Sequence, residues 1–266
     1  MPLKPLRIVL LMMAIASSLL FSCNESRTEE PVIEDFGYDY FPLEVGRTWE
    51  YEVDSVIYDP AIGGTAVDSF RTFIRESIVD TLLDNTGQVL FRLERYYRRS
   101  DTMAWQVEKV LTLSRDEQRA SRTEDNLRFT KLVFPVREGK FWDGNAFFDD
   151  SRLVFVAGES IQMFKNWQYR ILASGVPAAI GGMEFDDVVT VQNADNRYLN
   201  NFLELRLATE QYARGVGLIS RELFIWDTSC LVCCGGNTED GICQSLPWEE
   251  RVEKGFTLRQ RLIRYQ

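Results

Sequence analysis

The chain has 266 residues with a hydrophobic content of 45%, and its 30 lysines and arginines are outnumbered by 40 aspartates and glutamates. The net charge of −10 argues against binding to nucleic acid, whose phosphates favour a basic face, and against anionic lipid headgroups as a binding surface. Because the sequence contains no histidine, Ser-His-Asp and Cys-His nucleophile systems and histidine-ligated metal sites are excluded.

The N-terminal segment is apolar and short. Lys4 and Arg7 come first, and residues 8–21 are then almost entirely apolar. A transmembrane helix needs about 20 apolar residues, which is more than this run contains. A positive start, a short apolar run and a small residue before the break are typical of a secretory signal peptide, here residues 1–22. A plain cleaved signal and a retained anchor are the alternatives to the interpretation that follows.

The signal segment ends in Leu20-Phe21-Ser22-Cys23, which resembles the lipobox of bacterial lipoprotein signal peptides. The resemblance implies that Cys23 becomes the first residue of the mature protein and carries the lipid that attaches it to the membrane. The expected location is therefore the cell envelope, at the outer membrane. The protein could lie on the periplasmic face or on the surface-exposed face of that membrane.

An acidic tether follows the lipidated cysteine. The sequence NESRTEEPVIEDFG, residues 24–37, carries five acidic residues against one arginine. Such a segment is typical of a solvated linker, so we assign residues 23–37 to a flexible tether. The remaining residues, 38–266, are predicted to form a single β domain.

The folded part opens with YFPLEVGRTWEY, residues 40–51. Trp49, Tyr51 and Val53 alternate with acidic residues, which is the period of a half-buried strand. The segment resembles the YFPLxxGxxWxY opening of a class of uncharacterised secreted bacterial lipoproteins. Residues 212–219, YARGVGLI, are similar to the YAxGVGLI segment of the same class. The class brings no known activity with it.

A second copy of the opening pattern lies at residues 134–142. Phe, Pro, an aliphatic residue, Gly and Trp fall at the same offsets in residues 41–49 and 134–142. An internal duplication would explain the match. Convergent turn chemistry, with a Pro-Gly turn before a buried tryptophan, is the alternative.

The rest of the chain reads as strands joined by turns, with no sustained helical period. Strands are predicted at residues 65–83, 88–99, 103–113, 127–134, 152–156, 161–173, 183–191, 202–213, 218–226 and 249–265. Residues 114–126 are predicted as a short helical turn or a hairpin tip, and residues 176–182 as a turn. A glycine pair, Gly215 and Gly217, is predicted to form the turn of a hairpin. The predicted fold is all-β, a twisted antiparallel sheet that could curve into an open half-barrel by analogy with LolA-like carriers.

Four cysteines cluster in a glycine-rich loop, residues 228–247. They are Cys230, Cys233, Cys234 and Cys243, in the pattern C-x2-CC-x8-C. Four thiolates could hold zinc, but structural zinc sites usually show two separated C-x2-C pairs. An even number of cysteines outside the cytoplasm favours two disulfides that staple the loop, with redox activity as a further alternative. We predict two disulfides, of undetermined connectivity, and no metal.

Aromatic residues carry the functional prediction. Six of them are expected to face the sheet interior: Trp49, Tyr51, Trp105, Trp142, Trp167 and Tyr169. Such large side chains either fill a sealed core or line a concavity. A curved sheet with few helices is difficult to seal, which favours a pocket. We therefore predict an envelope module that binds an apolar small molecule or an envelope protein, without a cofactor. The sequence assigns no ligand-binding residue.

The rival prediction is a histidine-free, carboxylate-dependent hydrolase such as a glycosidase. Adjacent carboxylates occur at Asp149-Asp150 and Asp186-Asp187. Neighbouring residues on a strand point to opposite faces, so neither pair would converge on one substrate atom without a turn. No catalytic residue is assigned. Two carboxylates about 5 to 9 Å apart across a cleft would favour the enzyme, and a continuous apolar concavity would favour the binding module.

Overall fold

A computed structural model of the protein describes residues 35–61, 64–199, 201–229 and 246–266. Residues from Phe36 to Gln266 belong to one compact unit. The predicted lipidation site, Cys23, and the predicted disulfide cysteines, Cys230 to Cys243, lie outside the described residues. Within the described part of the chain, no helix is long and apolar enough to cross a membrane.

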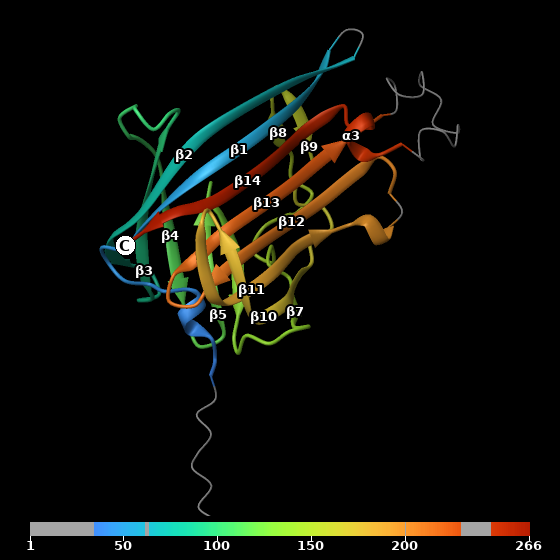
Figure 1. Ribbon diagram of the computed structural model, residues 1–266. Coiled ribbons are helices and arrows are strands. Elements are labelled where there is room, and N and C mark those ends of the chain that lie inside the picture. The colour runs from blue at the N-terminus through green and yellow to red at the C-terminus, as the bar shows by residue number, and fades with distance from the viewer. Residues whose placement is uncertain (1–34, 62–63, 200, 230–245) are drawn as a thin grey trace, which may run out of the picture. The chain divides into compact units, whose positions relative to one another are not determined.

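Twelve strands form one antiparallel sheet, which confirms the all-β prediction (Figure 1). They are β1 (Thr48–Ala61), β2 (Gly64–Leu83), β3 (Val89–Arg98), β4 (Gln106–Arg115), β5 (Arg119–Glu124), β6 (Leu127–Val133), β7 (Phe141–Trp142), β10 (Tyr169–Ile180), β11 (Met183–Asp195), β12 (Glu204–Ala213), β13 (Gly217–Asp227) and β14 (Lys254–Tyr265). Strands β8 (Val154–Val156) and β9 (Glu159–Ile161) form a separate hairpin. The helical turns are η1 (Tyr38–Tyr40), η2 (Arg197–Leu199) and α3 (Trp248–Arg251).

The sheet consists of two meanders of six strands each. Strands β1 to β6 follow one another in space, and so do β7 and β10 to β14. The last strand of the second meander, β14, pairs with the first strand of the first, β1. Figure 1 shows β2, β1, β14, β13 and β12 side by side in one twisted surface.

The two edges of the sheet lie next to each other. The amide of Thr130, on the edge strand β6, donates to the carbonyl of Gly144 at 2.8 Å. The Trp142 indole, on the edge strand β7, donates to the carbonyl of Thr130 at 2.9 Å. The curved sheet predicted from the sequence is therefore nearly closed, with a seam between β6 and β7.

The two Phe-Pro segments occupy equivalent places at the starts of the two meanders. The amide of Gly46 donates to the carbonyl of Ile78, and the amide of Gly139 donates to the carbonyl of Ile171, both at 2.8 Å. Each isoleucine amide donates back to the carbonyl of the residue after the glycine, at 2.9 Å in both copies. Both glycines have positive φ, where other residues are strained. Similar turns at the start of two meanders of six strands each favour internal duplication over convergence.

Two predicted strand patterns are confirmed. Trp49, Tyr51 and Val53 are buried at alternating positions of β1, so their side chains lie on the inner face of the sheet. Strands β12 and β13 form the predicted hairpin, in which Gly215 and Gly217 have φ values of 73° and 97°.

One predicted turn region is wrong at its centre. Residues 114–126 are not a helical turn or a hairpin tip, because they contain strand β5. This strand pairs with β4 on one side and with β6 on the other. The ladder hydrogen bonds on both sides outweigh the low strand propensity of its polar sequence.

Further boundaries differ from the predictions. The strand predicted at residues 249–265 begins only at Lys254, because Trp248–Arg251 form the helical turn α3. The turn predicted at residues 176–182 is a continuation of β10 as far as Ile180, and the chain reverses at Gly181 and Gly182. Pro177 is tolerated because β10 has only β11 as a neighbour at that point. Residues 162–168, predicted as part of a strand, lie between β9 and β10, so only the ends of that prediction are in strands.

Candidate functional site

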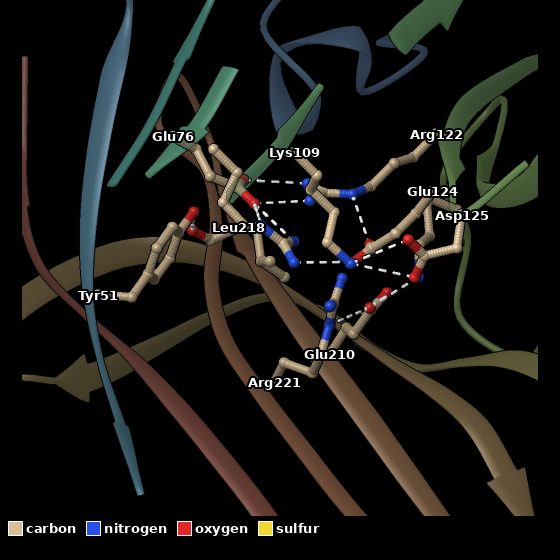
Figure 2. Close-up of polar contacts among 11 residues, drawn as sticks. Tyr51, Glu76, Lys109, Arg122, Glu124, Asp125, Glu210, Leu218 and Arg221 are labelled. Atoms are coloured by element: carbon tan, nitrogen blue, oxygen red, sulfur yellow. Dashed lines mark hydrogen bonds and ion pairs between the residues drawn. The ribbon is translucent and has the colours of Figure 1, made fainter. Parts of the chain in front are cut away.

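Charged side chains from distant strands meet inside the nearly closed sheet. Arg122 on β5 binds Glu76 on β2 through two parallel contacts, Nη2 to Oε1 at 2.6 Å and Nη1 to Oε2 at 3.0 Å. Arg95 on β3 donates from Nε to the same Oε1 at 2.9 Å and from Nη1 to Glu124 at 2.7 Å. Arg122 Nε closes the circuit with Glu124 at 3.2 Å. These four residues, here called the ionic ring, contain two cations and two carboxylates. Figure 2 labels Glu76, Arg122 and Glu124 of this ring.

Strand alternation and register explain how the ionic ring forms. Glu76 lies directly opposite Arg95 in the β2–β3 ladder, so their side chains share one face. The neighbouring inward positions are Ile78 and Leu93, which are paired with each other and fully buried. Glu76 and Arg95 therefore occupy inward-facing positions of β2 and β3, next to apolar core residues on the same strands.

The ionic ring controls the protonation of its own carboxylates. Burial alone would raise the pKa of Glu76, but the charges of Arg122 and Arg95 outweigh burial and hold that pKa at about 2. The same balance holds the pKa of Glu124 well below its usual value, with Arg122 and Arg95 again opposing burial. Both side chains are therefore ionised at neutral pH.

A second cluster is centred on Glu210 of β12. The ammonium of Lys131, on β6, contacts Glu210 Oε1 at 2.8 Å, and Arg221 Nε, on β13, contacts the same oxygen at 2.7 Å. The other oxygen accepts from the Tyr212 hydroxyl at 2.7 Å and from Asn193 Nδ2 at 3.4 Å. We call these five residues the Glu210 cluster; Figure 2 shows Glu210 and Arg221 beside the ionic ring.

The Glu210 cluster contains two cationic side chains and only one carboxylate. Burial would raise the pKa of Glu210, but Lys131 and Arg221 hold it far below its usual value. Burial, with a smaller contribution from the charge of Arg221, lowers the pKa of Lys131 to about 8 against the opposing effect of Glu210. At neutral pH, two cations therefore share one carboxylate.

A cavity of about 390 Å³ lies against both clusters. Its wall is largely apolar and includes Ile74, Leu127, Phe129, Met163, Phe164, Trp167, Leu223, Phe256 and Leu258. Its polar part includes Arg95, Glu124, Lys131, Asn193, Glu210, Arg221 and Gln260. Asp125, Arg152 and Leu153 also line it and are exposed, so the cavity has its mouth at these residues. The volume lies within the range of about 300 to 1,000 Å³ that small-molecule sites occupy.

The segment between β7 and β10 supplies one wall of the cavity. Rings from this segment form a packed group with β6, in which Phe164 has its centroid 5.5 Å from Phe129, 5.3 Å from Phe148 and 5.4 Å from Trp167. The β8–β9 hairpin in the same segment is held at β14, where the Lys254 ammonium donates to the carbonyl of Ser160 at 3.3 Å. Aromatic packing therefore holds this wall against the sheet.

A smaller cavity of about 40 Å³ also adjoins the clusters. Trp49, Tyr51 and Tyr212 line it together with Lys131 and Arg221, which line the larger cavity as well. The Trp49 indole donates to the carbonyl of Val216 at 2.6 Å, and the Tyr51 hydroxyl donates to that of Leu218 at 3.0 Å. This end of the interior is closely packed by polar-capped aromatic rings.

The structure places five of the six predicted aromatic residues in or against the core. Trp49, Tyr51, Trp167 and Tyr169 are buried, and Trp142 packs on the core from the edge strand. The prediction for Trp105 is wrong. The centroid of its ring lies 4.4 Å from the guanidinium of Arg75 and 4.3 Å from that of Arg98, outside the buried core. Cation–π contact with two arginines stabilises the position of this half-buried tryptophan outside the core.

The adjacent carboxylates do not form a catalytic pair. Asp149 accepts hydrogen bonds from the amide and hydroxyl of Ser151, at 2.9 and 2.6 Å, and so stabilises a turn. Asp187 pairs with Arg214 at 2.5 Å, whereas Asp186 is exposed. In the described part of the chain, no group of three or more His, Cys, Asp or Glu residues could hold a metal ion.

The buried charged residues of the interior were not predicted from the sequence. The strand predicted at residues 88–99 is present as β3, and one of its charged side chains, Arg95, is buried in the ionic ring. A usable signal is a charge on the inward parity of an otherwise apolar strand face, as in Leu93-x-Arg95 and Ile219-x-Arg221-x-Leu223. That signal identifies inward charges but not their partners, because Lys131 and Glu210 are 79 residues apart.

No protein-family model and no curated protein sequence matches the chain. Two solved structures are similar to it. One is described as an exported protein with a YmcC-like fold from Bacteroides fragilis NCTC 9343, with 7% identity, a TM-score of 0.35, and coverage of 85% of this chain and 98% of that chain. The other is described as a lipoprotein from Parabacteroides distasonis ATCC 8503, with 10% identity, a TM-score of 0.34 and the same coverage. Similarity at this level assigns neither fold nor function to this chain.

Proposed function

We propose that this chain is a lipid-anchored protein of the cell envelope that binds a small apolar ligand inside its nearly closed sheet. The observation that carries the proposal is the cavity of about 390 Å³, which has a largely apolar wall, a charged inner end and an exposed mouth. Concave, mostly apolar sites with a few convergent polar groups are the usual form of small-molecule sites.

The interior is poorly suited to the rival glycosidase chemistry. A glycosidase needs one carboxylic acid with a raised pKa to protonate the leaving group. The pKa values of Glu76, Glu124 and Glu210 are all lowered by neighbouring cations. These carboxylates stay ionised at neutral pH and serve as counterions.

Binding is tested with N-phenylnaphthylamine, a neutral apolar fluorescent probe, titrated against the purified full chain. We expect saturable binding and a change in tryptophan emission, because Trp167 lines the cavity. Substituting Leu258, another wall residue, with Trp should fill part of the cavity and weaken probe binding about tenfold or more, through lost contact area. Val67→Trp adds the same ring at an exposed position of β2 and should leave probe affinity unchanged.

Equal probe affinity in the Leu258→Trp and Val67→Trp variants would place the probe outside the cavity. If the unaltered chain shows no saturable binding and no change in emission, the cavity is not a binding site. Recognition of an envelope protein through surface loops would then be the better interpretation.

The anchor rests on Leu20-Phe21-Ser22-Cys23 and places the protein at the membrane through the lipid on Cys23, with the outer membrane as its proposed location. In cells that express the full chain, we expect it in the membrane fraction and Cys23→Ser largely in the soluble or secreted fraction. Cys243→Ser removes a cysteine elsewhere and should fractionate like the parent. Membrane association of Cys23→Ser equal to that of the parent would rule out lipidation at this residue.

A further inference from the structure

The Glu210 cluster leaves one positive charge without a counterion at the inner end of the cavity. Lys131 and Arg221 both contact Oε1 of Glu210, at 2.8 and 2.7 Å. The remaining oxygen of that carboxylate accepts from the neutral groups of Tyr212 and Asn193. One carboxylate therefore serves two buried cations.

The neighbouring charges do not supply the missing negative charge. The ionic ring contains equal numbers of cations and carboxylates, and Lys109 at its rim is matched by Asp125 at 3.0 Å. The charged residues that line the cavity are four cations, Arg95, Lys131, Arg152 and Arg221, and three carboxylates, Glu124, Asp125 and Glu210. The cavity is therefore locally positive in a chain whose net charge is −10.

Arg221 is positioned to bind an additional anion. Its Nε is engaged with Glu210, and within the described residues Glu210 is its one ion-pair partner. The residue lines both the larger and the smaller cavity. A guanidinium presents several N–H donors in a planar fork, which suits the two oxygens of a carboxylate or phosphate.

We propose that the ligand is a single-chain amphiphile whose anionic headgroup binds Arg221 and Lys131 while its apolar chain lies against Phe129, Phe164 and Leu258. This inference rests on the proposed function and specifies the chemistry of its ligand. A bound anion would offset the excess positive charge, and it would also oppose the lowering of the Lys131 pKa that burial and Arg221 produce.

Three probes with the same chain length separate the headgroup from the apolar chain. Decanoate, decanol and decylammonium are titrated against the purified full chain by calorimetry near pH 7. We expect decanoate to bind about tenfold or more tightly than decanol, because a charge-assisted hydrogen bond is stronger than a neutral one. Decylammonium should bind more weakly than decanol. Decyl phosphate then distinguishes the two anionic sources, a carboxylate and a phosphate, and a preference for either anion over decanol supports the proposal.

Arg221→Gln tests the residue. In this variant Lys131 and Glu210 form an equal pair, so the preference for decanoate over decanol should fall about tenfold while decanol affinity is retained. Arg71→Gln removes the same charge from an exposed pair with Asp54, on the opposite face of the sheet from the cavity, and should retain the preference. Arg221→Lys keeps the charge and should retain part of it.

The outcomes separate this inference from the proposed function. Equal binding of decanoate and decanol to the unaltered chain would overturn the anionic headgroup and leave an apolar site. An undiminished preference for decanoate in Arg221→Gln would overturn the role of Arg221. If none of the probes binds, the proposed function itself fails. The comparison of probes on the unaltered chain decides the headgroup even if Arg221→Gln does not fold.

Discussion

Replacing Glu76 by Gln is expected to lower the free energy of unfolding by about 3 to 5 kcal/mol. The Glu76 carboxylate accepts two hydrogen bonds from Arg122 and a third from Arg95, and all three side chains are buried. The amide of Gln retains the shape of the side chain but removes the charge. Two buried guanidinium groups would then share Glu124 alone, and a buried charge without its counterion costs several kcal/mol.

Urea unfolding of the full chain measures this loss, with Asp80→Asn as the matched control. Asp80 pairs with Arg92 at 2.7 Å on the exposed surface of the same strand, β2. The same chemical change there should have a much smaller effect, because solvent screens exposed ion pairs. A loss for Glu76→Gln no larger than that for Asp80→Asn would mean that the ionic ring does not hold the strands together.

Stability should fall steeply as the pH decreases from about 4.5 to about 2. In the folded state the pKa of Glu76 is held at about 2, below its ordinary value of 4.5, because Arg122 and Arg95 outweigh burial. Over this window the unfolded chain binds more protons than the folded chain, so acid favours unfolding. Glu76 alone contributes about 3 kcal/mol that is complete above pH 4.5 and lost toward pH 2. The lowered pKa values of Glu124 and Glu210 act in the same direction.

The contribution of Glu76 is isolated by the difference in unfolding free energy between the parent and Glu76→Gln, measured from pH 6 downward. This difference should shrink as the pH passes below 4.5, because only the parent has a carboxylate at position 76 to protonate. A difference that stays constant to pH 2 would show that Glu76 is not held ionised by its arginines.

Several features of the fold were accessible from residues that are close in sequence. The alternation of Trp49, Tyr51 and Val53 predicted an inward face for β1, because side chains on a strand alternate between its two faces. Gly215 and Gly217 predicted the β12–β13 hairpin, because a tight turn requires positive φ. The match between residues 41–49 and 134–142 offered internal duplication as one of two explanations, and the two meanders of the sheet favour it.

Other features depended on neighbouring strands and were predicted incorrectly. The polar sequence of β5 has no strand pattern of its own, and it is a strand because β4 and β6 pair with it on both sides. Trp105 is a large aromatic residue of the kind that usually packs in a core, yet Arg75 and Arg98 hold its ring outside the core. In both cases the deciding partners come from another strand, which a local pattern does not contain.

The sequence by itself determined the all-β class, the inward parity of the first strand and the absence of histidine chemistry, since each depends on composition or on neighbours along one strand. Only the tertiary structure decided the candidate site. The closure of the sheet brings Lys131 and Arg221 to Glu210, and Arg95 and Arg122 to Glu76, across separations of 11 to 79 residues. Whether a charge on a strand faces water or a cavity depends on where the curved sheet places that strand, and this is a property of the register of all twelve strands together.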